Sequence, residues 1–225
     1  KIVAGVDRNT DDSLGYPVFQ SLEACDVEVD AIIDFTAAPA VDHLLDYCAE
    51  KKVPVVLCST GLSDAQMAKV SESAKKVAVL RSANMSLGVN LLLKLVQEAA
   101  KVLASSGFDI EIVEKHHNQK KDAPSGTALA LAESMNEALG NQYHYVYDRS
   151  SVHEKRDPKE IGIASVRGGS IVGDHDVIFA GKDEVITFNH TAYSKAIFAK
   201  GALEAAKFLA GKEPGLYDMS DVVQL

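Results

Sequence analysis

Two adjacent histidines and a lysine follow a strand-like segment near the middle of the chain. Residues 108–113 alternate between apolar and polar side chains, His116, His117 and Lys120 come next, and residues 128–135 are good helix formers. Because neighbouring residues on a strand point to opposite faces, the two histidines cannot do the same job if the strand continues to its tip. Histidine can donate a proton near neutral pH, and lysine adds a fixed positive charge. The spacing therefore predicts a proton donor beside a binding site for an anion.

The start of the following helix adds to this predicted site. Pro124-Ser125-Gly126-Thr127 leads into the helix, and free N–H groups of Gly126 and Thr127 would attract an anion there. Three nearby lysines could supply a local basic patch: Lys115, Lys120 and Lys121. A polar loop with solvated histidines is the simpler alternative. The combination of histidines, lysine and helix start favours a site for a small carboxylate that is protonated during a reaction.

The loop reads H-H-x-x-K-x-D-x-P-S-G-T from His116 to Thr127. This pattern resembles the signature of the dihydrodipicolinate reductase family. The resemblance implies an oxidoreductase that uses NADH or NADPH to reduce 4-hydroxy-tetrahydrodipicolinate, a cyclic dicarboxylate, to tetrahydrodipicolinate in diaminopimelate and lysine biosynthesis. It implies two catalytic residues, His116 as the acid and Lys120, and three substrate-binding residues, His117, Gly126 and Thr127.

Composition and charge restrict the class of protein. The 225 residues are 47% hydrophobic and 24% charged, which is ordinary for a globular protein, and the formal net charge of −9 argues against a nucleic-acid-binding surface. The sequence has no apolar run of membrane-spanning length and does not open with a signal peptide. Cys25, Cys48 and Cys58 are odd in number and suggest a reducing environment, so we expect a cytoplasmic protein. These cysteines lack metal-site spacing, and Lys120 would repel a cation, so we expect no catalytic metal.

Strand and helix patterns alternate along the first 86 residues. Apolar strand patterns at 31–36, 53–57 and 77–80 are separated by helix patterns at 39–51 and 63–76. Ser63 and Gln66 are predicted to form a capping box at the start of the second helix. We therefore expect an α/β chain whose first domain, residues 1–86 and 194–225, is a Rossmann-like parallel sheet. Such a sheet binds a dinucleotide at the carboxyl ends of its strands.

Segments at the ends of these strands resemble the cofactor-binding segments of the family. Asp7-Arg8 resembles its acidic and basic pair at the adenosine ribose and phosphate, so the pair implies use of either NADH or NADPH. Cys58-Ser59-Thr60 stands where the family usually has Gly-Thr-Thr. The resemblance implies cofactor contacts from Asp7, Arg8, Cys58, Ser59, Thr60, Ser82, Ala83, Asn84 and Met85. The family's glycine-rich turn has no counterpart in these 225 residues, so we expect the whole protein to have a further N-terminal segment.

Residues 87–193 are expected to form a second, α+β domain with a mixed sheet. A helix pattern at 89–104 precedes the motif, and residues 141–159 are predicted to be an irregular connection. Three strand patterns follow without intervening helices, at 161–166, 171–179 and 184–189, and a last helix is predicted at 194–212. The resemblance implies that this domain binds the substrate and builds a homotetramer. His175 is expected to have a structural role.

Two other functions fit parts of the sequence. Another two-domain nicotinamide dehydrogenase, acting on a semialdehyde or a sugar, would share the fold but would lack the His-His-x-x-Lys loop. A dinucleotide-binding fragment or sensor without turnover is favoured only by the missing glycine-rich turn.

Overall fold

The computed structural model describes residues 1–9 and 12–223 and divides the chain into two compact units. Unit one contains Lys1–Ala83 and Gly201–Val222, and unit two contains Asn84–Lys200 together with Val223. The first boundary lies three residues before the predicted one at residue 86. The second lies inside helix α5, Ala196–Leu209, and not at its predicted start, residue 194.

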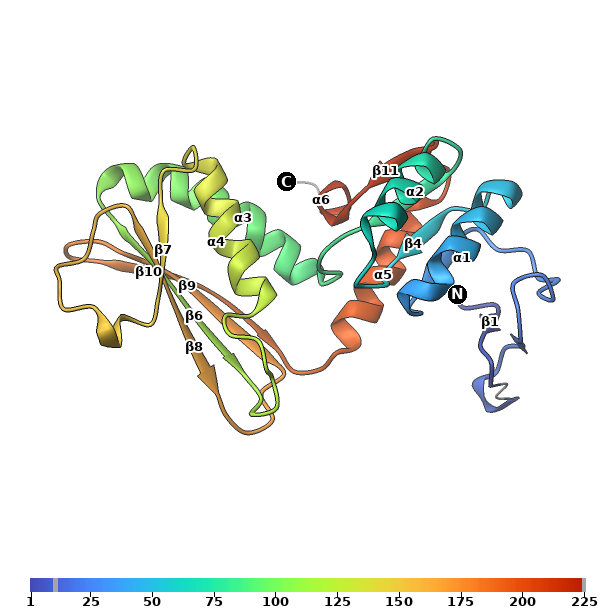
Figure 1. Ribbon diagram of the computed structural model, residues 1–225, viewed down its shortest axis with the longest axis horizontal. Coiled ribbons are helices and arrows are strands. Elements are labelled where there is room, and N and C mark those ends of the chain that lie inside the picture. The colour runs from blue at the N-terminus through green and yellow to red at the C-terminus, as the bar shows by residue number, and fades with distance from the viewer. Residues whose placement is uncertain (10–11, 224–225) are drawn as a thin grey trace. The chain divides into compact units, whose positions relative to one another are not determined.

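Unit one is built on a four-stranded parallel sheet in the order β11-β5-β4-β3 (Figure 1). Its strands are β3 (Ile32–Asp34), β4 (Val55–Leu57), β5 (Ala78–Arg81) and β11 (Gly215–Tyr217). The connecting helices are α1 (Ala38–Lys51) and α2 (Asp64–Ala74), and α6 (Met219–Val222) ends the unit. This is the predicted Rossmann-like arrangement, and α2 begins with the predicted capping box at Ser63 and Gln66. Strand β11 was not predicted from the sequence.

Apolar side chains cover both faces of this sheet. Val55, Leu57 and Val79 pack with α1 and α2 in one cluster. Val56 and Leu80 alternate to the opposite face and are also fully buried, which explains why these strands read as continuous apolar runs. Helix α5 adds further buried residues to the unit: Ala202, Ala205 and Leu209.

The first residues of the chain do not join this sheet, which corrects the prediction of one sheet from residue 1. Strand β1 is short, Gly5–Val6, and pairs in parallel with β2, Val18–Phe19, in a separate two-stranded sheet. The apolar residues before Asp7 indicate a strand, but the sequence could not show which strand would be its partner. A short 3-10 turn, Asp12–Leu14, precedes β2.

Unit two contains a five-stranded mixed sheet in the order β10-β9-β6-β8-β7. Strand β6 (Asp109–His116) is central, with β8 (Glu160–Arg167) parallel on one side and β9 (Gly173–Ala180) antiparallel on the other. Strand β10 (Val185–Ala192) continues from β9 in a hairpin. Thus β8 and β9 are consecutive in the sequence, yet both pair with β6.

The fifth strand lies in the segment predicted to be irregular, and this prediction was wrong. Strand β7 (His144–Tyr147) pairs in parallel with β8, and a 3-10 turn, Arg149–Ser151, follows it. Arg156 then donates to carboxylate oxygens of Glu111 and Asp109, at 2.9 and 3.0 Å, which holds the rest of the connection against β6. These partners are far away in the sequence, so the local polar composition gave no indication of order.

Two helices cover one face of the mixed sheet, as Figure 1 shows. They are α3 (Leu87–Leu103), which runs into the 3-10 turn Ala104–Ser106, and α4 (Gly126–Ala138). Their apolar residues pack in one cluster with inward side chains of the strands, among them Ile110, Ile112, Ile161, Val177 and Phe179. This core fixes the face of β6 that lies beneath α4.

Candidate active site

Strand β6 continues to His116, so the two histidines are the last strand residue and the first loop residue. Every second residue of β6 is buried, and the inward row runs from Ile110 and Ile112 to Glu114 and His116. His116 is buried, whereas His117 is half-buried in the loop. The two histidines therefore differ in burial, and His117 lies just beyond the strand to which the alternation applies.

Beside His116 lies a buried carboxylate, that of Glu114, which is 0% exposed. His116 Nδ1 lies 2.6 Å from Glu114 Oε2, and Arg167 donates to both oxygens at 2.8 and 2.6 Å. The backbone N–H of Ser125 donates to Oε1 at 3.1 Å. Burial alone would raise the pKa of Glu114. Hydrogen bonds to the carboxylate, of which the one from Arg167 has the largest effect, outweigh burial and lower the pKa to about 2. Glu114 is therefore an ionised acceptor.

The sequence patterns alone assign no role to Glu114, Arg167 or Ser125. One signal could have found the first. A glutamate in the inward row of an otherwise apolar strand face needs a buried partner of opposite charge. That partner is Arg167, 53 residues further along the chain, and only the parallel pairing of β6 with β8 brings it close.

The loop after His116 is held against the end of β8. The N–H of Gly168 donates to the carbonyl of His116 at 2.9 Å, and Arg167 Nη2 donates to the carbonyl of Asp122 at 2.7 Å. Lys120 Nζ lies 2.9 Å from a carboxylate oxygen of Asp122, and the Lys120 side chain is 22% exposed. Hydrogen bonds therefore hold the loop backbone that carries Lys120, while part of the Lys120 side chain stays accessible.

Helix α4 begins where the sequence predicted, and Ser125 is its N-cap. Ser125 Oγ accepts from the N–H of Ala128 at 3.2 Å. Gly126 and Thr127 occupy the first turn, where their N–H groups have no acceptor four residues earlier in the helix. Thr127 is also fixed from its side chain, since Asn84 Nδ2 lies 3.3 Å from Thr127 Oγ1. The positive end of α4 is thus available to an anion.

Lys115 does not belong to the predicted basic patch. It is on the opposite face of β6 from His116, where Nζ forms ion pairs with Asp174 at 2.9 Å and Asp176 at 2.8 Å. The prediction was wrong because Lys115 and His116 are neighbours on a strand, and neighbouring strand side chains point to opposite faces. Lys120 and Lys121 remain in the loop.

His175 packs against His116 inside unit two. The ring centroids lie 5.1 Å apart in an edge-to-face arrangement, and His175 Nε2 lies 3.0 Å from Ser125 Oγ. Its Nδ1 is among the buried side-chain atoms without a partner in the described residues. Burial, followed by the nearby His116, lowers the pKa of His175 from 6.5 to about 4. His175 is therefore neutral at physiological pH.

This low pKa predicts a loss of stability in acid. Between about pH 6.5 and pH 4 the unfolded chain binds a proton at His175 that the folded chain does not, so stability falls as the pH decreases through this range. The full effect is about 3 kcal/mol, at about 1.4 kcal/mol per pKa unit. Urea unfolding at several pH values should show a flatter curve in this range for His175→Gln than for the parent. Parallel curves would contradict the prediction.

Predicted cofactor segments lie at the carboxyl edge of the parallel sheet in unit one. Asp34 ends β3 and is 3% exposed. Its carboxylate accepts from Ser59 Oγ and Thr36 Oγ1, each at 2.6 Å, so the loops after β3 and β4 are tied together. Cys58 Sγ points toward the carbonyl of Val56. Burial and, to a smaller extent, the negative charge of Asp34 raise the pKa of the Cys58 thiol to about 12. Thr60 is exposed beyond this network.

At this edge Ser82 and Ala83 follow β5, and Asn84 and Met85 come next in the chain as the first residues of unit two. Arg81 Nε is buried without a hydrogen-bond partner among the described residues, so this edge holds an unused donor. Small polar side chains, exposed backbone and such a donor fit a dinucleotide. Asp7 and Arg8 are exposed after β1, and the separate pairing of β1 means that no sheet hydrogen bonds link them to the other segments.

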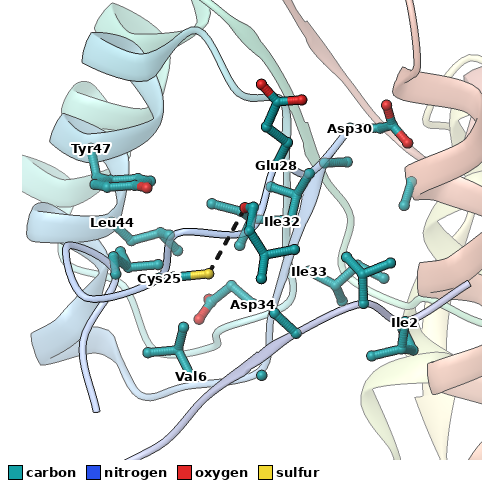
Figure 2. Close-up of a pocket in the computed structure, with 18 of the residues that line it drawn as sticks. Ile2, Val6, Cys25, Glu28, Asp30, Ile32, Ile33, Asp34, Leu44 and Tyr47 are labelled. Carbon is teal, nitrogen blue, oxygen red and sulfur yellow. Dashed lines mark hydrogen bonds between the residues drawn. The ribbon is translucent and has the colours of Figure 1, made fainter. Parts of the chain in front are cut away.

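Unit one contains a cavity of about 720 Å³ whose lining includes no residue of the histidine motif. Figure 2 shows its lining, in which Ile2 and Val6 from the first residues face Ile32 and Ile33 of β3 and Leu44 of α1. The lining is mainly apolar, although Asp34 reaches it from the polar network. The lining does not contain His116, His117 or Lys120, so this cavity carries none of the predicted proton-donating chemistry.

Two further searches cover only the residues that the structure describes. Within residues 1–9 and 12–223, no group of three or more His, Cys, Asp and Glu side chains is arranged to hold a metal ion. In the same ranges, no helix has the length and apolar character needed to cross a membrane.

Comparison with protein families gives two adjoining matches. The family profile described as dihydrodipicolinate reductase, N-terminus, matches residues 1–85, and the profile described as dihydrodipicolinate reductase, C-terminus, matches residues 88–223. Together they cover nearly the whole chain.

Relatives with established names agree with this. A 4-hydroxy-tetrahydrodipicolinate reductase of Caldanaerobacter subterraneus subsp. tengcongensis is 54% identical over 100% of this chain and 88% of its own length. The Clostridium tetani protein of the same name is 48% identical over 97% of this chain and 85% of its own. A solved dipicolinate-bound dihydrodipicolinate reductase from Paenisporosarcina sp. TG-14 matches with a TM-score of 0.81 at 25% identity, covering 99% of this chain and 89% of that one. The chain therefore belongs to the dihydrodipicolinate reductase family, oxidoreductases that use NADH or NADPH to reduce 4-hydroxy-tetrahydrodipicolinate in diaminopimelate and lysine biosynthesis.

Proposed function

We propose that His116 donates the proton in the reduction of the cyclic substrate and that Lys120 stabilises the charge that develops. One observation carries the proposal: a single segment, from the tip of β6 to the start of α4, presents a histidine, a lysine and free helix N–H groups. When bound, the reduced nicotinamide supplies the hydride. The hydroxyl group of the substrate leaves as water together with a ring proton, and the His116 proton quenches the electron density that hydride addition leaves on the ring system.

The substrate carboxylate binds to His117, Lys120 and the N–H groups of Gly126 and Thr127. The start of α4 supports this because its dipole and its unused N–H groups favour a carboxylate. The relative from Paenisporosarcina is described as dipicolinate-bound, and dipicolinate, like the substrate, carries two carboxylates on a six-membered nitrogen ring. The same chemical class therefore suits the present loop.

Lys120 must exchange its partner to reach such a ligand. Its ion pair with Asp122 is at the surface, since the Asp122 side chain is 60% exposed. Exposed ion pairs contribute little, about 0–1 kcal/mol, so an incoming carboxylate can replace Asp122 at small cost. Charge on Lys120 then serves both the bound anion and the transition state.

Unit one is the dinucleotide-binding domain, and unit two is the substrate-binding domain. The proposed cofactor residues are the ones at the strand ends: Asp7, Arg8, Cys58, Ser59, Thr60, Ser82, Ala83, Asn84 and Met85. The polar edge around Asp34 and Ser59 supports this placement. Asp7 would bind free ribose hydroxyls, and Arg8 would tolerate a 2′-phosphate, so we expect use of both NADH and NADPH.

Dipicolinate binding tests the anion site separately from turnover. Isothermal titration calorimetry on the complete enzyme should show that Lys120→Ala and His117→Gln each weaken dipicolinate binding at least about tenfold, since a hydrogen bond to a charged group contributes about 1.5–3 kcal/mol. Lys121→Ala is the matched control, because Lys121 is a neighbouring exposed lysine. If Lys120→Ala and His117→Gln bind dipicolinate as tightly as Lys121→Ala and the parent do, Lys120 and His117 do not belong to the anion site.

A homotetramer in the cytoplasm completes the proposal. Helices α3 and α4 cover one face of the mixed sheet, and the other face carries apolar side chains such as Val166, 45% exposed, and Val185, 61% exposed. A sheet with one uncovered, partly apolar face needs a partner, and the family resemblance supplies a second copy of this chain. Sedimentation equilibrium measures the number of copies directly.

A further inference from the structure

The carboxylate of Glu114 is more deeply enclosed than its neighbours in the site. Glu114 is two residues before His116 on β6, so both side chains are on the face covered by α4. The Glu114 side chain is 0% exposed, whereas that of His116 keeps 10% of its surface accessible. A buried charge at this place needs full compensation, because desolvating a carboxylate costs several kcal/mol.

Four donors hydrogen-bond to the oxygens of this carboxylate, and the Ser165 side chain also helps to lower its pKa. Oε2 accepts from His116 Nδ1 and Arg167 Nη1, and Oε1 accepts from Arg167 Nη2 and the N–H of Ser125, all within 3.1 Å. Two donors on each oxygen match the lone pairs of an ionised carboxylate. The four partners come from three elements: β6 itself, β8 and the N-cap of α4.

This arrangement dictates the state of the imidazole ring. An ionised carboxylate can only accept, so His116 Nδ1 must carry a hydrogen. In the neutral ring the lone pair is then on Nε2, and in the protonated ring the proton that can leave is on Nε2. No described residue hydrogen-bonds to Nε2, and a Cβ added at Gly173 would come within 3.2 Å of it. The glycine therefore leaves space beside the nitrogen that would exchange the proton.

We infer that Glu114 is a positioning residue that fixes the Nδ1–H tautomer of His116 and, through the N–H of Ser125, aligns the first turn of α4 with that ring. The inference rests on the proposed function in taking His116 as the proton donor. One carboxylate then sets the geometry of both the proton donor and the anion site. Arg167 keeps the carboxylate ionised while the proton moves at Nε2, because its two hydrogen bonds remain in place.

The tautomer can be measured without turnover. In the complete enzyme with ¹⁵N-labelled histidine, free of substrate and at a pH where the ring is neutral, long-range ¹H–¹⁵N spectra distinguish Nδ1–H from Nε2–H. The His116 signals are those that disappear in His116→Gln. We expect Nδ1–H in the parent, and finding Nε2–H there would overturn the inference even if no Glu114 variant folds.

Glu114→Gln tests the link from tautomer to rate. The amide can accept or donate, so the ring should lose its single tautomer, and kcat should fall at least about tenfold, with a smaller change in KM. Removing the carboxylate that orients a catalytic histidine can cost far more, up to about 10⁴-fold in a serine protease. A fall in rate with the Nδ1–H tautomer retained would contradict the inference, because simple loss of structure would explain it.

Glu160→Gln is the matched control. Glu160 is also buried, at 3% exposed, and pairs with Arg149 at the other end of β8. This variant should lose stability without a change in tautomer or kcat. Failure of the proposed function would look different. In that case Glu114→Gln changes the tautomer, but Glu114→Gln and His116→Gln both keep the parental rate. His116 is then not the proton donor, whereas the positioning of its ring by Glu114 stands.

Discussion

Replacing His116 by glutamine is expected to lower kcat by about 100- to 10,000-fold while KM stays near the parental value. This is the usual contribution of general acid catalysis, equal to about 3–5.5 kcal/mol of activation free energy. Glutamine can still occupy the space between Glu114 and His175, so substrate binding at the start of α4 should persist. Steady-state kinetics with NADH at saturating concentration would measure both constants.

A parallel experiment on the neighbouring histidine identifies the proton donor more specifically. His117→Gln serves as the comparison, because the loss of a ground-state contact appears mainly in KM. If His117→Gln abolishes turnover and His116→Gln does not, the two roles have been assigned to the wrong histidines.

Replacing Arg167 by methionine is expected to destabilise the folded chain by about 3–5 kcal/mol. Breaking a buried ion pair by removing one partner has a cost of this size, because the remaining charge has no compensation. Methionine keeps much of the length of the side chain but leaves Glu114 with only His116 and the Ser125 N–H as donors. The Asp122 carbonyl also loses its partner, so the loop that carries Lys120 loosens as well.

The destabilisation should depend on pH in a defined direction. In the parent, the pKa of Glu114 is lowered from 4.5 to about 2, so its contribution to stability is present above about pH 4.5 and is lost as the pH falls toward 2. Without Arg167 the carboxyl group is protonated more readily, which relieves the buried charge. The difference between parent and variant should therefore be largest at neutral pH and decrease below about pH 4.5.

Urea denaturation of the parent and Arg167→Met at neutral and acidic pH measures this difference. Lys121→Met is a suitable control, because Lys121 is an exposed residue in the same loop and surface substitutions usually change stability by less than about 0.5 kcal/mol. An effect of Arg167→Met that is equally small at neutral pH would show that Glu114 does not depend on its arginine.

Local patterns predicted those features of the fold that depend on neighbours in the sequence. The capping box of Ser63 and Gln66 is present, and Ser125 caps the helix that starts at Gly126. The strand predicted before the histidines is present and ends at His116. Each of these depends on contacts within a few residues, for which the amino-acid sequence carries the whole signal.

Features that depend on distant partners were missed. Strand β7 is in a polar, aromatic segment, and it becomes a strand because β8 offers an edge and Arg156 ties the following connection to β6. Strand β1 has a clear strand pattern, but its partner could not be predicted. The same limit hid the pairing of Glu114 with Arg167 and therefore most of the polar network around the predicted proton donor.

The central place of β6 has a consequence for how the chain acquires its activity. Helices α3 and α4 lie close to β6 in the sequence, but both of its neighbours, β8 and β9, come after the long connection that contains β7. Closing such long loops costs entropy before the new contacts repay it, which makes sheets of this kind slow to form. His116 reaches its place only when Arg167 has arrived to neutralise Glu114. We therefore expect the surroundings of the proposed proton donor to form late in folding, after the long connection has closed.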